Sequence, residues 1–256
     1  MTVRVKICGL RPGDDLSFAD SPWVSHVGFV FVPASRRYVA PESVRKMVAQ
    51  LDGRAEPVGV FAGAGAEAVR AAAVQSGIRV AQLHGDEGPE VCDALREAGL
   101  QVWKSLSVAS SGEDAEALAA RIALFAPHVD ALLLDAAPPK SAPAGVNGGH
   151  GRPFDWRVLP KAIRVARTRT ALPPLWVAGG IHADNIGDLL SVFAPDGVDV
   201  SSGVETEGRK DPRRIEALLN ELTVRAFCGA ARYAEEAEQF VRQHEPRAVT
   251  SEEAIP

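Results

Sequence analysis

The sequence predicts a single α/β domain in which eight strand–helix units close into a barrel. Short runs rich in β-branched residues alternate with longer segments of helical periodicity along nearly the whole chain. Some strand candidates, such as Ala131 to Leu134, are apolar on both faces, as a parallel sheet covered by helices requires. The length of 256 residues fits one (β/α)8, or TIM, barrel. The alternative is an open doubly wound sheet, but residues 8–13 lack the G-x-G-x-x-G turn expected after its first strand.

The eight units can be assigned in order along the chain. The expected strands are Val3–Cys8, His26–Val32, Pro57–Phe61, Arg79–Leu83, Gln101–Ser105, Val129–Asp135, Leu175–Ala178 and Gly197–Val200. The expected helices are residues 13–20, 41–51, 65–76, 88–98, 113–125, 155–167, 184–193 and 211–222. Some helices have a proline in their first turn, for example Pro41 and Pro212, where the missing N–H is not needed.

Two segments fall outside the eight units. Residues 136–153 form a Pro- and Gly-rich loop after the sixth strand, and loops of this length are usually functional lids or disordered segments. Residues 1–222 are predicted to form the barrel, and residues 223–256 a C-terminal extension. The extension keeps an approximate helical spacing of apolar residues as far as Val241, which predicts a packed helix, whereas Glu245–Pro256 are expected to be disordered.

The composition argues against several kinds of partner. The formal net charge is −5, so the chain has no basic footprint for nucleic acid or an anionic membrane. No apolar run approaches the roughly 18 residues of a membrane span, and the N-terminus lacks the apolar centre of a signal peptide, which predicts a cytoplasmic location. Cys8, Cys92 and Cys228 are widely spaced, which argues against a disulfide framework and a zinc site. No metal or cofactor is expected, and a protein partner is not indicated.

Polar residues and glycine turns gather at the ends of the expected strands, where a (β/α)8 barrel builds its active site. They are Cys8, Arg37, His84, Asp135, Gly179, Gly180, Ser202 and Gly203. The glycine turns after the seventh and eighth strands expose backbone N–H groups, which is typical of a phosphate site, although ordinary turn chemistry is the alternative. For Cys8 the alternative is a buried strand thiol.

Nine short blocks of sequence follow one another in a recognisable order from residue 3 to about residue 222. They are Lys6–Leu10, Gly28–Phe31, Arg37–Val39, Val58–Phe61, Gln82–Glu87, Leu132–Asp135, Phe154–Trp156, Ala178–Ile181 and Gly197–Glu205. Each block alone is a weak signal, but together and in register they resemble the phosphoribosylanthranilate isomerase family of tryptophan biosynthesis.

The resemblance implies an intramolecular oxidoreductase of the aldose–ketose type. It would convert N-(5-phosphoribosyl)anthranilate to 1-(2-carboxyphenylamino)-1-deoxyribulose 5-phosphate by an Amadori rearrangement. Opening the sugar ring needs a general acid, and removing the C2′ proton needs a general base. By the family pattern Asp135 is the acid and Cys8 the base. A thiol acts as a base only as thiolate, and Lys6, Arg11 or Arg37 could favour that form by lowering the pKa of Cys8.

The resemblance also implies a set of substrate-binding residues. Arg37 is expected to bind the planar carboxylate of the anthranilate, which suits a guanidinium fork. Gly179, Gly180, Ser202 and Gly203 are expected to bind the phosphate. His84 is a further candidate, equally suited to anchoring a loop, and Gly149 is a candidate in the loop after the sixth strand.

Three positions at the expected barrel mouth depart from the family pattern. Arg11 and Arg36 stand where Thr and Pro are common, and His150 stands where Thr or Ser is common. Their clustering leaves open a paralogue that isomerises a related amino-sugar phosphate. A catalytically lapsed barrel that binds a partner through its C-terminal extension is a further alternative, against which the retention of Cys8 and Asp135 counts.

Overall fold

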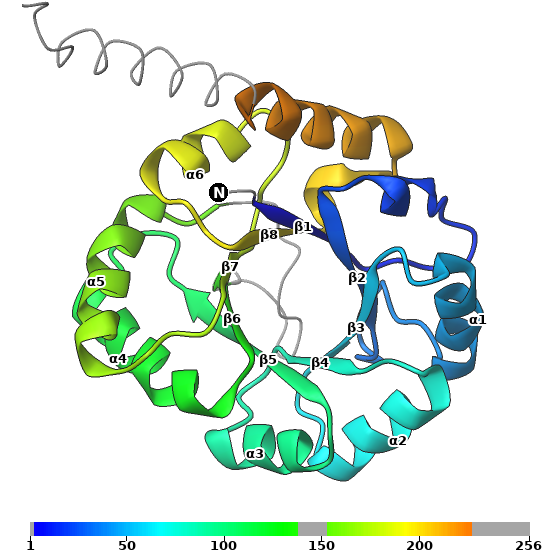
Figure 1. Cartoon of the computed structure of the whole chain (residues 1–256), viewed down its shortest axis with the longest axis horizontal. Coiled ribbons are helices and arrows are strands. Elements are labelled where there is room, and N and C mark those ends of the chain that lie inside the picture. Colours follow the sequence, from blue (N-terminus) through cyan, green and yellow to red (C-terminus); the bar gives the residue numbers. More distant parts are fainter. Residues whose placement is uncertain (1–2, 138–152, 227–256) are drawn as a thin grey trace, which may run out of the picture.

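A closed barrel of eight parallel strands forms the centre of the molecule. The computed structural model describes residues 3–137 and 153–226. The strands follow one another around the barrel in chain order, and β1 closes it by pairing with both β2 and β8. Helices alternate with the strands and surround them (Figure 1). The predicted (β/α)8 fold is confirmed.

The strands and helices agree with the predicted order. The barrel strands are β1 (Arg4–Cys8), β2 (Val24–Val30), β3 (Glu56–Phe61), β4 (Val80–Leu83), β5 (Gln101–Val108), β6 (Ala131–Ala136), β7 (Leu175–Val177) and β8 (Gly197–Val200). The α-helices are α1 (Pro41–Leu51), α2 (Ala66–Ser76), α3 (Pro89–Glu97), α4 (Ala115–Phe125), α5 (Leu159–Arg169) and α6 (Ile186–Val192), and residues 212–226 are helical as well. Short 3-10 helices are η1 (Ser17–Asp20), η2 (Ala126–His128), η3 (Trp156–Val158) and η4 (Ser202–Val204), and β9 (Glu205–Thr206) pairs with β10 (Arg209–Lys210) in a small hairpin.

The helix expected at residues 13–20 does not form. Only the single 3-10 turn η1 is present there. The backbone N–H of Arg11 donates to Asp14 Oδ2 at 2.8 Å, and both the backbone N–H and the hydroxyl of Ser17 donate to Asp15 at 2.9 Å. Such local bonds from short polar side chains compete with helix formation, so the prediction of a helix in this segment is wrong.

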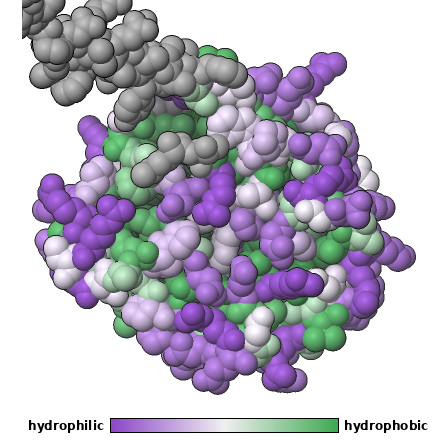
Figure 2. Space-filling model, viewed as in Figure 1, coloured by the Kyte–Doolittle hydropathy of each residue, from purple (hydrophilic) through white to green (hydrophobic). Residues whose placement is uncertain are grey.

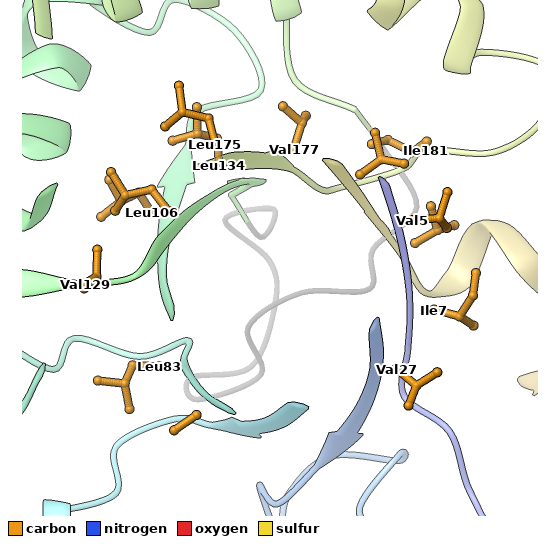
Figure 3. Packing of buried hydrophobic residues seen from close by; sticks show 14 of the residues in the cluster. Val5, Ile7, Val27, Leu83, Leu106, Val129, Leu134, Leu175, Val177 and Ile181 are labelled. Atoms are coloured by element: carbon orange, nitrogen blue, oxygen red, sulfur yellow. The ribbon is translucent and has the colours of Figure 1, made fainter. Parts of the chain in front are cut away.

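Side chains alternate between the two faces of the barrel wall. On β1, Val5 and Ile7 point outward, as Figure 3 shows, and join the main core between strands and helices. Lys6 and Cys8 occupy the alternate, interior positions of the same strand. Part of the interior is filled by a second apolar cluster that consists of Val58, Val80, Trp103, Ala131, Leu133, Trp176 and Ala178. The polar interior residues near the carboxyl ends of the strands therefore stand out against an apolar barrel.

The C-terminal part of the chain is described only as far as residue 226. The helix that begins at residue 212 continues through residue 226, past the expected domain boundary at residue 222. Thr223 Oγ1 accepts a hydrogen bond of 2.9 Å from Trp23 Nε1, which ties this helix to the start of β2. The rest of the predicted extension, residues 227–256, and most of the predicted loop, with Gly149 and His150, lie outside the described residues.

The face seen in Figure 2 is predominantly hydrophilic, and its hydrophobic side chains form small separate groups. Two of the most exposed large apolar residues, Val74 and Leu124, lie on different helices. Isolated apolar side chains of this kind are normal on a protein surface. No helix in the described ranges is both long and apolar enough to cross a membrane.

Candidate active site

A cavity of about 350 Å³ lies at the carboxyl ends of the strands. This volume is in the range of small-molecule sites. Its walls include eight of the nine predicted site residues, which are Cys8, Arg37, His84, Asp135, Gly179, Gly180, Ser202 and Gly203. The ninth, Gly149, lies outside the described residues. The fold thus brings together residues from both ends of the sequence at one place.

The thiol of Cys8, the last residue of β1, lies against β2 at Gly28. A Cβ atom built on Gly28 would lie 2.6 Å from Cys8 Sγ and 3.1 Å from Lys6 Nζ. Glycine is needed at this position because the thiol and the ammonium group occupy the space of a side chain. Lys6 is fully buried and forms an ion pair of 3.0 Å with Asp199 Oδ1, its register partner on β8.

The environment of Cys8 favours the neutral thiol. Burial raises the pKa of Cys8 and the charge of Asp199 raises it further, while Lys6 and Lys210 lower it without outweighing burial. Burial also acts to lower the pKa of Lys6, but Asp199 and Cys8 more than compensate, so this pKa is raised and Lys6 stays cationic. The expectation that nearby cations would bring the pKa of Cys8 below its ordinary value is therefore wrong, because desolvation is the larger effect.

Asp135 lies on the interior face of β6 and contacts His84. His84 Nε2 is 3.3 Å from Asp135 Oδ2, and Gln82 Nε2 is 3.2 Å from His84 Nδ1. An amide nitrogen can only donate, so with this orientation Nδ1 accepts and the proton of the neutral ring is on Nε2, directed at Asp135. The other carboxylate oxygen, Asp135 Oδ1, lies on the side of Gly179. A Cβ atom built on Gly179 would be 2.9 Å from this oxygen.

Gln82 contributes an unsatisfied acceptor to the cavity wall. Its side chain lines the cavity and is almost completely buried. Within the described part of the chain, Gln82 Oε1 accepts no hydrogen bond. A buried oxygen without a donor costs free energy.

The two glycine turns pack against each other at the cavity wall. Gly179 has a φ of 89°, and a Cβ there would lie 2.6 Å from a backbone nitrogen of β6. A Cβ on Gly203 would lie 1.9 Å from Ile181 O. The backbone N–H groups of Gly180, Ser202 and Gly203 donate to no other described residue. Successive N–H groups of this kind form a concave site that suits a phosphate.

The helix expected at residues 184–193, after the turn at Gly179 and Gly180, begins later in the chain than predicted. α6 begins only at Ile186, whereas η4 begins directly at Ser202. Asn185 fixes the intervening loop, because its Nδ2 donates to Gly180 O at 2.8 Å and its Oδ1 accepts from His182 N at 2.9 Å. The backbone N–H groups, rather than a helix dipole after β7, are therefore the positive feature of this turn.

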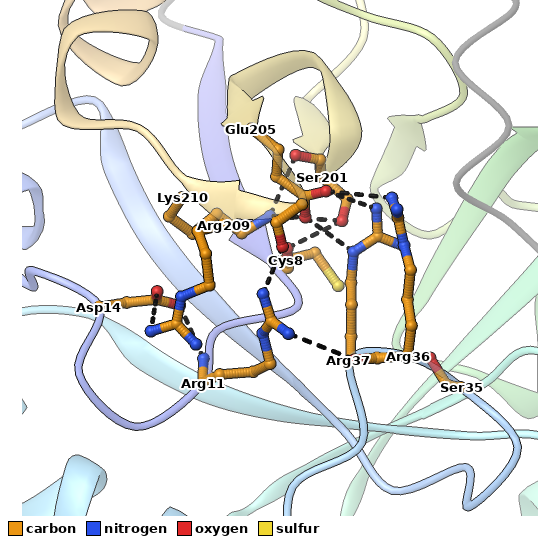
Figure 4. A network of polar contacts seen from close by, with 11 residues as sticks. Cys8, Arg11, Asp14, Ser35, Arg36, Arg37, Ser201, Glu205, Arg209 and Lys210 are labelled. Carbon is orange, nitrogen blue, oxygen red and sulfur yellow. Dashed lines mark hydrogen bonds and ion pairs between the residues drawn. The ribbon is translucent and has the colours of Figure 1, made fainter.

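Arg37 is buried and held in place by Glu205. Its Nε and Nη2 donate to the two carboxylate oxygens at 2.7 and 2.8 Å. Lys210 Nζ donates to the same carboxylate at 2.8 Å and Arg36 Nη2 at 3.2 Å (Figure 4). Although burial acts to raise the pKa of Glu205, the bonds from Arg37 and Lys210 bring it down to about 2. One edge of the Arg37 guanidinium is thereby fixed.

Arg11 does not reach the cavity wall among the described residues. Its guanidinium donates to the backbone oxygens of Gly208 and Arg36. Close by, Arg209 forms an ion pair of 2.8 Å with Asp14. These contacts fasten the loop after β1 to the β9–β10 hairpin, so Arg11 supports the mouth of the barrel from outside the cavity.

Sequence reasoning missed several polar residues of this site. They are Gln82, Asn185, Asp199, Glu205 and Lys210. Gln82 and Asp199 are polar residues at interior positions of otherwise apolar strands, and the period-two alternation of the strands contains that signal. Glu205 and Lys210 follow β8 in a hairpin whose partners are distant in sequence, so no local pattern marks them.

Comparison with known sequences gives one consistent family. A family model described as N-(5'phosphoribosyl)anthranilate (PRA) isomerase matches residues 5–221. A protein of Brevibacillus brevis named N-(5'-phosphoribosyl)anthranilate isomerase is 36% identical over 217 residues, which are 84% of this chain and 91% of the relative. A protein of the same name from Rhodopseudomonas palustris is 38% identical over 238 residues, which are 92% of this chain and 99% of the relative.

Solved structures agree with the sequence comparison. The phosphoribosyl anthranilate isomerase of Thermus thermophilus superposes with a TM-score of 0.71 at 29% identity, covering 87% of this chain and 99% of that one. A phosphoribosyl anthranilate isomerase in complex with reduced 1-(o-carboxyphenylamino)-1-deoxyribulose 5-phosphate superposes with a TM-score of 0.69 at 31% identity, covering 86% and 98% of the two chains. The residues that the family model matches include the eight barrel strands, apart from Arg4, and the cavity residues, and the chain therefore belongs to the N-(5'-phosphoribosyl)anthranilate isomerase family.

Proposed function

We propose that this chain isomerises N-(5-phosphoribosyl)anthranilate in tryptophan biosynthesis, with Asp135 as general acid and Cys8 as general base. The observation that carries the assignment of these two roles is that both residues line one cavity, which also contains the paired glycine turns. The product is 1-(2-carboxyphenylamino)-1-deoxyribulose 5-phosphate. The activity is that of the family, and the roles of Asp135 and Cys8 follow the family pattern, which agrees with the need for one acid and one base.

The first step opens the sugar ring. Asp135, in its protonated form, donates a proton to the ring oxygen. The bond between C1′ and this oxygen breaks, and the lone pair of the anilino nitrogen forms a C=N bond to C1′. His84 supports this step by holding Asp135 Oδ2, so that Oδ1 faces the substrate.

The second step moves a proton from carbon. The Cys8 thiolate removes the C2′ proton, the electron pair of that C–H bond forms a C1′=C2′ bond, and the C=N electrons return to nitrogen. The resulting enolamine gains a proton at C1′ and loses the proton of its C2′ hydroxyl, which gives the ketone. Lys6 lies beside the thiol and stabilises its anionic form by charge.

The remaining residues of the cavity hold the substrate. The N–H groups of Gly180, Ser202 and Gly203 would bind the phosphate, and the open edge of Arg37 would bind the anthranilate carboxylate. A substrate with charge at both ends is thereby fixed across the barrel mouth, with its reacting carbons between Cys8 and Asp135.

Substitution of the two reacting residues tests the proposed roles. Cys8→Ala and Asp135→Asn are each expected to lower kcat by at least about a hundredfold, the usual contribution of a general acid or base. Turnover is followed by the loss of anthranilate fluorescence, and circular dichroism checks that the fold is intact. Cys92→Ala, which removes a buried thiol of α3 remote from the cavity, is the matched control and should keep its turnover. Near-normal turnover of either active-site variant would refute its role.

The alternative functions make different predictions. A paralogue with an altered substrate would turn over a related amino-sugar phosphate faster than phosphoribosylanthranilate. A lapsed barrel would show no turnover, and its C-terminal residues would bind a partner enzyme in a pull-down. The cytoplasmic location stays a prediction.

A further inference from the structure

Arg36 and Arg37 are neighbours in the chain but differ in environment. The turn that carries them is fixed by backbone bonds from Ser35 N to Val32 O and from Tyr38 N to Ser35 O, at 2.9 and 3.0 Å. Within this turn the Arg37 side chain is 9% exposed and that of Arg36 is 61% exposed. Both line the cavity. Arg36 is therefore a solvent-accessible guanidinium at the cavity mouth, beside the buried one.

The charges around Glu205 do not balance. Its carboxylate accepts hydrogen bonds from Arg36, Arg37 and Lys210, so one negative charge faces three positive charges. The local excess is two positive charges on a chain whose formal net charge is −5. An incoming carboxylate would reduce this excess, which favours binding of an anion at this place.

Donors remain on both guanidinium groups. Arg37 uses Nε and Nη2 toward Glu205, and its Nη1 donates to no described residue. Arg36 uses only Nη2 toward the same carboxylate, at 3.2 Å. The backbone of Arg36 is held from the other side by Arg11 Nη1, which lies 3.4 Å from Arg36 O. A planar carboxylate has two oxygens and four lone-pair positions, enough to accept from both residues.

We propose that Arg36 is a specificity-determining residue that binds the aromatic carboxylate of the substrate together with Arg37. The proposal rests on the proposed function, because it assigns one more contact to the same substrate. Arg37 supplies a buried guanidinium with a fixed orientation, and Arg36 supplies a second positive charge from the mouth. The consequence is a preference for substrates that carry this carboxylate over those that lack it.

Binding of two matched ligands tests the proposal. The ligands are reduced 1-(o-carboxyphenylamino)-1-deoxyribulose 5-phosphate and the same molecule without its carboxylate. Arg36→Ala should weaken binding of the first about three- to tenfold, the range of a partly exposed charged hydrogen bond, and change binding of the second by less than about twofold. Arg36→Lys should recover part of the loss. Titration calorimetry on the full chain measures each Kd.

Arg70→Ala is the matched control. Arg70 lies on α2, its side chain is 55% exposed, and it forms one ion pair of 3.3 Å with Glu67, which resembles the exposure and the single contact of Arg36. This variant should bind both ligands as the wild type does. If it weakens the carboxylated ligand as much as Arg36→Ala does, the effect comes from net charge and the proposal is wrong.

Other outcomes are equally decisive. Equal weakening of both ligands by Arg36→Ala, or no change in either, would overturn the proposal. The proposed function is judged separately, from wild-type turnover of phosphoribosylanthranilate. Absent turnover combined with a selective loss in Arg36→Ala would contradict the function and leave the carboxylate contact standing.

Discussion

At the residue scale, the two charges of the Lys6–Asp199 ion pair act on the Cys8 thiol in opposite directions. Both partners are buried inside the barrel and are 3.0 Å apart. Lys6 lowers the pKa of Cys8 against the larger effect of burial. A charged pair in this position is costly to desolvate, so its presence beside the proposed base has a chemical reason in addition to any structural one.

Replacing Lys6 tests this electrostatic role. In Lys6→Met the pKa of Cys8 should rise further, because the nearest stabilising cation is lost while burial and Asp199 remain. The fraction of thiolate at a given pH falls, so the rising limb of kcat/KM against pH should move to higher pH. A loss of about tenfold in rate at neutral pH corresponds to about one pKa unit. The rate of thiol alkylation as a function of pH, with Cys8→Ala as the blank, measures the shift.

The same substitution leaves Asp199 buried without its partner, which by itself destabilises the fold. The double variant Lys6→Met with Asp199→Asn removes both charges. It should recover most of the lost stability in urea unfolding, because no unpaired charge remains. An unshifted rate profile in Lys6→Met alone, together with restored stability in the double variant, would show that Lys6 acts only structurally.

At the element scale, the β9–β10 hairpin acts as a carrier of charged groups. Glu205 and Lys210 are register partners across it. Its turn contains Glu207 and Gly208, both with positive φ of 51° and 74°. The hairpin follows β8 after the short helix η4 and places Glu205 where it can hold Arg37, which comes from the loop after β2. Figure 4 shows this meeting of two distant segments.

Replacing Glu205 should weaken both the fold and substrate binding. Glu205→Gln leaves Arg37 and Lys210 buried without a carboxylate, which costs about 3–5 kcal/mol for a broken buried ion pair. The pKa of Glu205 is about 2 against an ordinary value of 4.5, so its stabilisation is complete above pH 4.5 and is lost as the pH falls toward 2. The stability gap between wild type and variant should therefore narrow below pH 4.5.

Urea unfolding at several pH values measures this gap. Glu67→Gln is the control, because the Glu67 side chain is 89% exposed and its ion pair with Arg70 lies on the surface of α2. It should not change the pH dependence. A gap for Glu205→Gln that stays constant from pH 7 to pH 3 would contradict the assigned role of the carboxylate. KM for the carboxylated substrate should rise as well, because Arg37 loses its fixed orientation.

At the scale of the whole molecule, the barrel interior divides into an apolar part and a polar part. The ring of His26 on β2 is tilted against Trp103, with centroids 4.8 Å apart, and meets Trp176 edge to face at 5.1 Å; the Trp176 ring also lies under Arg4. Burial, with the charges of Lys6 and Arg4, lowers the pKa of His26 to about 4. This histidine is therefore neutral at neutral pH and forms part of the packed interior.

The stability of the whole chain should depend on His26 in mild acid. An unfolded chain binds a proton on this ring below about pH 6.5, whereas the folded chain does so only near pH 4, so stability falls as the pH decreases between these values. The pKa difference of about 2.5 units, from 6.5 to about 4, corresponds to a loss of at most about 3–4 kcal/mol. His26→Gln should flatten the curve of unfolding free energy against pH in this window. An unchanged slope would show that His26 titrates normally in the folded chain.

Only the tertiary structure determines which charged side chains form ion pairs. Lys6 and Asp199 are 193 positions apart, and Arg37 and Glu205 are 168 positions apart. No local pattern pairs residues at such separations, because a strand or helix constrains only its near neighbours. Barrel closure brings β1 beside β8 and the loop after β2 beside the β9–β10 hairpin. The sign of the shift in the pKa of Cys8 depends on this closure, since burial outweighs the cations.

The sequence by itself determined the eight strands and their order, the helices after all strands but the first, the family, and the positions of the candidate residues at the strand ends. These properties follow from local periodicity, from turn residues and from the spacing of short blocks, all of which are written along one stretch of chain. The helix expected at residues 13–20 was lost to hydrogen bonds of Asp14 and Asp15. The partners of Cys8, Arg37 and Asp135 emerged only from the closed barrel, because desolvation and charge pairing act through space between segments that the chain order keeps far apart.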